Sequence, residues 1–270
     1  MADRLHDLTV WLRLLQASIM GQLSYRRSFL LEVVGRFVLT TLELVAVVAL
    51  FQHIDALAGW TQWEVVYLYG MASLALGLSE LFTDGLNQMG ELVRQGTLDG
   101  ILVRPVSPLM QVLGRQCRPF HLGRALQGVL AMGLALASLG WVPTATGAAM
   151  LVVNVLATAT VFAALFVAGA ATQVYTVQSA EAFNAFTYGG VQMAQYPLPV
   201  YPRWLQGLFV FAVPVGFTAY FPAVALLGKP DVFGLGPAAP WLAPVVAALY
   251  FGLAVLWWRR ALNHYQSTGS

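Results

Sequence analysis

The stretch FLLEVVGRFVLTTLELVAVVALF, residues 29–51, decides the fold class. It exceeds the roughly 20 apolar residues that an α-helix needs to cross the hydrocarbon core of a bilayer. The whole chain has the same character, because 59% of its residues are hydrophobic, only 10% are charged, and its mean hydropathy is +0.70. A soluble domain has roughly 25% charged residues. The sequence therefore predicts an all-α polytopic membrane protein.

Apolar segments of suitable length predict six transmembrane helices within one membrane domain, residues 29–262. A polar segment, residues 83–108, separates the second span from the third, and a tail follows at 263–270. The predicted spans cover residues 29–51, 63–82, 109–141, 148–175, 180–196 and 241–258.

Residues 204–227 are also apolar, and they decide between seven crossings and six. Arg and Lys concentrate on the cytoplasmic side of membrane proteins. A seventh crossing would move Arg259 and Arg260 to the outside, whereas six crossings keep them inside with most of the other arginines. We therefore expect both termini to be cytoplasmic and residues 197–228 to form an external re-entrant segment.

The N-terminal residues 1–28 predict an amphipathic helix in the membrane interface. Leu5, Leu12 and Ile19 lie on an apolar pattern of helical spacing, and charged residues surround it. The scattered charges argue against a cleavable signal peptide. The alternative is a short frayed cytoplasmic tail.

The polar segment at 83–108 predicts a short amphipathic helix at the cytoplasmic face. Leu86, Met89 and Leu92 fall on one helical face, whereas Glu91 and Arg94 fall elsewhere. Such a helix could dock on a partner and transmit its motion to the membrane domain. The alternative is an ordinary solvated loop between two spans.

Two motifs support a family resemblance. Residues 90–108 read GELVRQGTLDGILVRPVSP, and residues 196–205 read YPLPVYPRWL, with further prolines following in the same apolar stretch. In order and spacing these segments resemble the permease subunits of type-2 ABC exporters, in particular a branch whose substrates are mostly uncharacterised. The resemblance covers nearly the whole chain.

This resemblance implies a permease that forms a translocation pathway with a second permease chain, a heterodimer rather than a homodimer. It implies two separate ATPase subunits that bind ATP and Mg²⁺, export rather than import, and a bacterial inner membrane. In such a permease the ATPase-coupling residues would be Leu86, Met89, Glu91, Leu92, Arg94, Asp99 and Arg104, and the re-entrant segment would contain Pro197, Pro199, Pro202, Pro214 and Pro222.

Charged residues inside predicted spans are candidates for function, because a charge in hydrocarbon is costly. Glu32 and Arg36 stand four residues apart and could pair on one helical face. Glu43 lies near the middle of the first span and has no partner nearby in sequence. These residues either face the translocation pathway or lock the helical bundle.

Motifs for other chemistry are missing from the sequence. There is no Gly-x-x-x-x-Gly-Lys-Ser/Thr phosphate loop, and the four histidines are too scattered to predict a metal site. Cys117 is the only cysteine. We therefore expect no catalytic residue, metal or cofactor in this chain. The alternative function is a secondary transporter that uses intramembrane carboxylates, although the internal repeat typical of that class is not visible.

Overall fold

The computed structural model describes residues 2–176, 179–231, 233–236 and 238–266. These residues form helices and a single isolated bridge between Leu57 and Trp60, so the all-α prediction is confirmed. In chain order the elements are α1 (Ala2–Leu23), α2 (Arg26–Leu50), α3 (Gln62–Thr83), η1 (Asp84–Gln88), α4 (Met89–Arg94), α5 (Thr97–Leu102), α6 (Pro108–Arg115), η2 (Pro119–His121), α7 (Leu122–Ser138), α8 (Ala145–Tyr175), α9 (Ala180–Gln195), η4 (Leu198–Val200), α10 (Arg203–Gly207), η5 (Leu208–Ala212), α11 (Val215–Leu227) and α12 (Ala239–His264).

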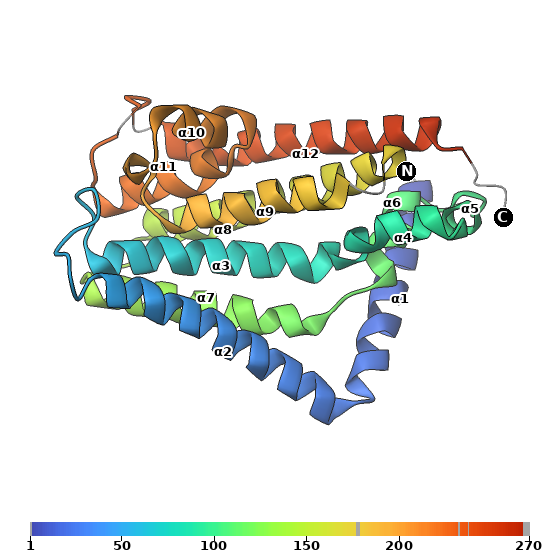
Figure 1. The fold of residues 1–270 in the computed structure, drawn as a ribbon, viewed down its shortest axis with the longest axis horizontal. Helices are drawn as coiled ribbons and strands as arrows, with labels where there is room; N and C mark the ends of the chain where they lie inside the picture. The colour runs from blue at the N-terminus through green and yellow to red at the C-terminus, as the bar shows by residue number, and fades with distance from the viewer. Residues whose placement is uncertain (1, 177–178, 232, 237, 267–270) are drawn as a thin grey trace.

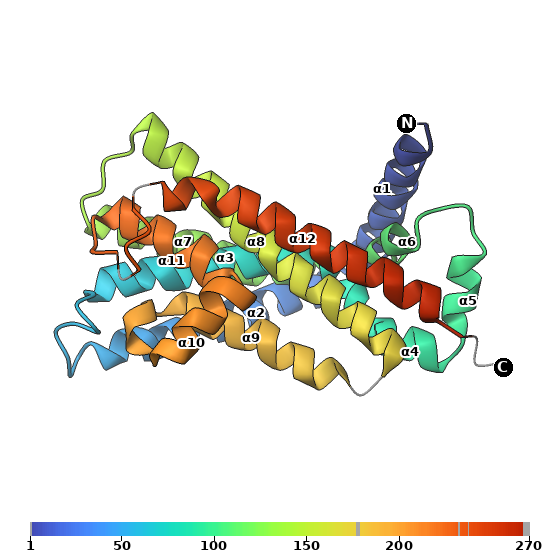
Figure 2. The same cartoon turned by 90° about the horizontal axis from the view of Figure 1, so that it is seen from above.

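The long helices run side by side, and α1 stands across one end of them (Figure 1). We call this the terminal end, because it holds both chain termini together with α1, α4 and α5 (Figures 1 and 2). The opposite, or hairpin, end holds α10, α11 and the α2–α3 connection (Figures 1 and 2).

Among the described residues, five helices are long and apolar enough to cross a membrane, and a bent pair raises the number to six. The five begin at Arg26, Gln62, Pro119, Ala145 and Ala239. The bent pair consists of residues 203–212 and Val215–Leu227, which meet at 102°. The predicted fifth span corresponds to α9, which at 16 residues is shorter than the roughly 20 residues of a typical crossing.

The first two spans occupy very different positions in the bundle. In the most apolar 18-residue stretch of α2 only 11% of the residues are buried. In the corresponding stretch of the span that begins with α3, 83% are buried. α3 is therefore the central helix of the chain, whereas α2 presents its apolar side chains outward. In a membrane protein such a face contacts lipid or another subunit.

Close backbone contact joins α3 to α7. A Cβ atom added at Gly128 of α7 would collide with the backbone of α3 at Gly70 and Leu74, and one added at Gly70 would collide with Met132. Small residues allow membrane helices to approach closely and gain dispersion contacts. Nearby Ala135 is fully buried.

The predicted continuous helix over residues 109–141 is wrong. The chain instead forms α6, an extended stretch at Gln116 and Arg118, and then η2 and α7. Pro119 explains part of the break, because a proline disfavours the helical conformation of the residue before it. The rest comes from α1, where the side chains of Ser18 and Gln22 donate hydrogen bonds to the carbonyl oxygen of Cys117.

The N-terminal helix is present and longer than a frayed tail. It packs on α6, where the side chains of Trp11 and Leu14 lie against Gly114. Leu15 is buried, whereas Leu12 and Met20 are exposed. Its orientation across the bundle fits a helix that lies along the membrane surface (Figure 1).

Candidate functional site at the terminal end of the bundle

A buried carboxylate forms the centre of an ionic network at the terminal end. Glu80, in the last turn of α3, has a side chain that is 2% exposed. Nδ1 of His121 lies 3.0 Å from its Oε2 atom, and the Tyr188 hydroxyl donates a hydrogen bond of 3.3 Å to Oε1. The guanidinium groups of Arg36 and Arg124 lie 3.7 Å and 3.8 Å away. Such pairing offsets the cost of burying the charge.

A second carboxylate extends the network by one helical turn. Asp84 begins η1, four residues after Glu80. Nε2 of His121 lies 3.4 Å from Asp84 Oδ1, and Nε of Arg118 lies 3.2 Å from Oδ2. His121 thus bridges two carboxylates, and a ring that carries both protons could donate to both. The network joins side chains from α2, α3, η1, η2, α7 and α9.

The segment that follows Asp84 is attached to the helical bundle rather than free in solvent. Leu86, Met89 and Leu92 are buried, with exposed fractions of 4% or less. The backbone N–H of Gly90 donates a hydrogen bond of 2.9 Å to the Oε1 atom of Gln173 on α8. α4 is therefore connected to α3 through the chain and to α8 through this contact.

One comparison with known proteins identifies the family. A family model described as ABC-2 family transporter protein matches residues 37–269. The chain belongs to the ABC-2 transporter family. No curated protein and no solved structure was found to match it. The chain is therefore a multi-pass membrane component for transport that is not itself catalytic, and its family implies partnership with ABC ATPase subunits.

The structure divides the predicted coupling residues of this ABC-2 permease into two groups. Leu86, Met89 and Leu92 face the permease's own helices, as described above. Three charged members lie outward. Glu91 and Arg94 pair with each other at side-chain exposures of 44% and 69%, and Arg104 is exposed. Asp99 is half-buried on α5.

Asp99 lies close to the C-terminal end of the permease. Burial, reinforced by Asp99, raises the pKa of the Tyr265 phenol just beyond α12. The last helix and the coupling segment are thus neighbours at the terminal end.

The predicted Glu32–Arg36 pair is wrong. The Arg36 guanidinium turns instead toward Glu80 of α3, because that buried carboxylate needs a cation, whereas Glu32 is exposed to solvent. Glu32 has no ion-pair partner within the described part of the chain.

Glu43 has a partner that is distant in sequence. The Tyr69 hydroxyl lies 3.1 Å from a Glu43 carboxylate oxygen and 2.9 Å from the Thr40 carbonyl oxygen. Glu43 is exposed overall, but its carboxylate lies against α3, on the same side of α2 as the buried Thr40 and Val47. The pathway role of Glu43 stays a prediction.

The prolines of the predicted re-entrant segment mark its bends. Pro197 lies immediately before η4, Pro199 lies within it, and Pro202 precedes α10. Pro214 lies at the 102° bend, and Pro222 lies inside α11.

A salt bridge at the hairpin end joins the external parts of the predicted topology. Nζ of Lys229 lies 2.8 Å from Oε2 of Glu64 and donates a hydrogen bond of 2.9 Å to the carbonyl oxygen of Gly59. Glu64 also accepts a hydrogen bond from the backbone N–H of Thr61 at the start of α3. The end of α11 is thereby fastened to the α2–α3 connection.

The sequence interpretation missed the ionic network. It treated His121 as one of four scattered histidines and left Arg118, Arg124 and Tyr188 without a role. A signal was available, because Arg118, His121 and Arg124 recur every third residue as the chain enters the third span. Glu80 and Asp84, four residues apart, supply the matching acids.

Proposed function

We propose that this ABC-2 permease forms an export pathway with a second, unlike permease chain and is driven by two ATPase subunits that dock at its terminal end. In this arrangement the terminal end faces the bacterial cytoplasm. Six spans cross the inner membrane, and residues 197–228 form an external re-entrant segment. ATP and Mg²⁺ bind in the ATPase subunits.

The observation that carries the proposal is the division of residues 84–104 into a buried face and an exposed face. The exposed face offers Glu91, Arg94 and Arg104 together with Val103, whose side chain is 83% exposed. Protein interfaces combine an apolar centre with a polar rim, and Val103 with its charged neighbours could supply both. The buried face is joined to α8 through Gly90 and to the ionic network through Asp84.

This arrangement would transmit force without any chemistry in the permease. A partner that displaces α4 would also displace Asp84, which immediately precedes it in η1. Because His121 contacts both Asp84 and Glu80, the displacement would reach the start of α7 and the end of α3 together. Packed elements with two arrangements transmit motion in this way.

Topology is supported by the distribution of the basic residues and by the position of the hairpin. Arg94, Arg104, Arg118, Arg259 and Arg260 are all carried by segments at the terminal end, which fits a cytoplasmic location (Figure 1). The bent pair stays near the hairpin end in both views (Figures 1 and 2). This favours a re-entrant segment over a seventh crossing.

Co-purification tests the partnership. A tagged wild-type chain should bring down an ATPase subunit and a second permease, whereas Val103→Asp should lose the ATPase and keep the permease. Phe211→Asp provides a matched control, since Phe211 is 69% exposed at the hairpin end and should leave ATPase binding unchanged. If the wild-type chain brings down no ATPase, the proposal fails.

Coupling is tested separately in vesicles that contain the complete complex. The double variant Glu91→Ala and Arg94→Ala should retain the ATPase subunits but lose the dependence of ATP hydrolysis on the permease. Hydrolysis with the same dependence as wild type would contradict the coupling role. A secondary transporter would instead show substrate movement that follows the proton gradient without ATP and falls in Glu43→Gln.

A further inference from the structure

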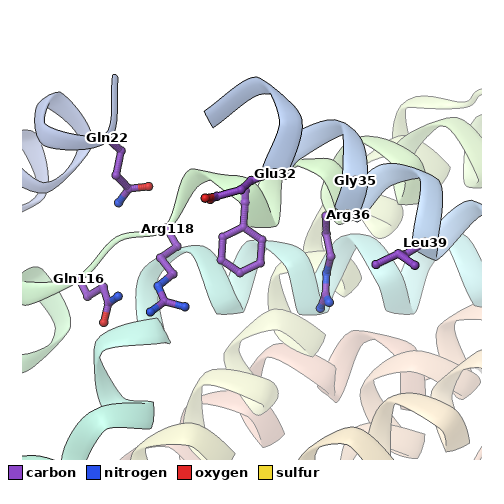
Figure 3. A pocket seen from close by; sticks show the side chains of 8 residues that line it. Gln22, Glu32, Gly35, Arg36, Leu39, Gln116 and Arg118 are labelled. Atoms are coloured by element: carbon purple, nitrogen blue, oxygen red, sulfur yellow. The ribbon is translucent and has the colours of Figure 1, made fainter. Parts of the chain in front are cut away.

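A cavity of about 720 Å³ opens at the terminal end between α1, α2 and the break in the third span. Its lining combines acid, base, amide and apolar groups, among them Glu32, Arg36, Arg118, Gln22 and Leu39 (Figure 3). A smaller cavity of about 250 Å³ shares Gln22 and Glu32 with it. The two cavities therefore adjoin near the turn between α1 and α2.

The charged groups of this cavity are partly accessible to a ligand. Glu32 is exposed and makes no ion pair with any residue that the structure describes. Arg118 uses Nε toward Asp84, yet its side chain remains 45% exposed. Nη2 of Arg36 lies 3.7 Å from Glu80, and the Arg36 side chain is 25% exposed. The site thus offers one exposed carboxylate and two partly exposed guanidinium groups.

These opposite charges lie on different sides of the same space. In Figure 3 the Glu32 carboxylate points toward Gln22, while the guanidinium groups of Arg118 and Arg36 extend along the other side. A ligand that carries an amine at one position and a phosphate at another matches this arrangement. Guanidinium groups bind phosphate through strong charge-assisted hydrogen bonds, and a carboxylate accepts hydrogen bonds from a primary ammonium.

The apolar part of the site continues along α2. Leu39 lines the cavity with a side chain that is 58% exposed, and Leu42, one turn further on, is 59% exposed. Both lie on the outward face of α2, which in a membrane contacts lipid. An acyl chain could follow this face while the head group stays in the cavity.

We propose that this cavity binds the head group of a zwitterionic amphiphile with a primary ammonium and a phosphodiester, such as a phosphatidylethanolamine. The ammonium binds Glu32, the phosphate binds Arg118 and Arg36, and an acyl chain lies along Leu39 and Leu42. The proposal requires a membrane location but does not depend on the ATPase partnership or on the direction of transport.

Binding can be measured on the purified full-length chain, together with any subunits that accompany it, by using a fluorescent phosphatidylethanolamine as the probe. Phosphatidylglycerol, which lacks the amine, should compete about tenfold more weakly than unlabelled phosphatidylethanolamine. Glu32→Gln should remove this preference, because the amide no longer attracts the ammonium. Equal competition by both lipids in the wild type would overturn the proposal.

Two glycines provide a matched pair of blocking variants. A Cβ atom added at Gly35 meets no atom within 4 Å, and Gly35 lines the cavity, so Gly35→Phe should obstruct it and reduce binding about tenfold or more. Gly133 of α7 has the same open surroundings but lies outside the cavity, and Gly133→Phe should bind normally. Unchanged binding in Gly35→Phe would contradict the proposed site.

A further competition experiment distinguishes a membrane lipid from a soluble amino-phosphate as the ligand. Glycerophosphoethanolamine has the same head group without acyl chains and should compete much more weakly than the intact lipid. Equal competition by glycerophosphoethanolamine and the intact lipid would overturn the proposal that the ligand is an amphiphile. If Gly35→Phe fails to fold, the exposed and nearly isosteric Glu32→Gln variant still decides, because retained selectivity would exclude the Glu32–ammonium contact.

Discussion

Nδ1 of His121 lies 3.0 Å from Oε2 of Glu80, although 41 residues separate them in the sequence. This contact joins the end of α3 to the start of α7 in the interior of the bundle. Arg36 and Arg124 approach the same carboxylate from other helices. With the Tyr188 hydroxyl, Glu80 is therefore a buried anion that has four cationic or polar partners.

Replacing Glu80 by Gln should destabilise the permease strongly. The substitution leaves the buried Arg124 and the partly exposed Arg36 beside a neutral amide, and breaking a buried ion pair in this way costs about 3–5 kcal/mol. Thermal unfolding in detergent measures the loss. Glu91→Gln serves as the control, because Glu91 is exposed and its replacement should have little effect; equal shifts for both variants would contradict a structural role for the network.

Gly128→Val should weaken the packing of α7 on α3. The added side chain collides with the backbone of Gly70 and Leu74, which cannot move away as a flexible side chain can. Overpacking of this kind costs about 1–3 kcal/mol. Gly133→Val on the same helix meets open space and should be nearly neutral. Unfolding in detergent compares the two, and a similar stability would show that the close approach is not required.

Lys229 and Glu64 should show a favourable coupling energy. Their side chains are only 19% and 11% exposed, and hydrogen bonds to charged groups contribute about 1.5–3 kcal/mol. A double-mutant cycle with Lys229→Met and Glu64→Gln isolates the interaction from the other contacts of each residue. Additive losses in the double variant would mean that the two residues do not stabilise each other.

Cys117 should react slowly with maleimides at neutral pH. Burial, and then the nearby charge of Asp84, raises the pKa of its thiol, so the fraction of reactive thiolate at pH 7 is lower than for a free cysteine. Alkylation should accelerate as the pH rises, with a midpoint above that of an ordinary thiol. Gln95→Cys in a Cys117→Ser background gives an exposed reference, expected to react about tenfold or more faster at pH 7. Equal rates would place Cys117 on the surface.

Much of the fold was predictable from hydropathy alone. The predicted spans at 29–51, 63–82, 148–175 and 241–258 lie on α2, α3, α8 and α12, because each is a long apolar run of the length that a bilayer requires. The family resemblance of residues 90–108 was confirmed as well. Both conclusions depend on local sequence, which is why they could be reached without coordinates.

The errors share a physical cause, which is contact between residues distant in sequence. The local spacing of Glu32 and Arg36 suggested a pair, yet Glu80 competes better for Arg36 because it is buried. The break at Cys117 depends on side chains of α1 that lie 95 and 99 residues away. Tertiary partners of this kind leave no periodic pattern in the sequence, although Pro119 marked the break locally.

The salt bridge between Lys229 and Glu64 places both residues at one membrane face and so requires an even number of crossings between them. A chain that starts and finishes at the same membrane face must cross the membrane an even number of times. Three candidate spans, α3, α7 and α8, lie between these residues, so one further crossing is needed, from α9 or from the bent pair but not from both. With α2 and α12 the total is six, which supports the proposal that both termini share one side of the membrane.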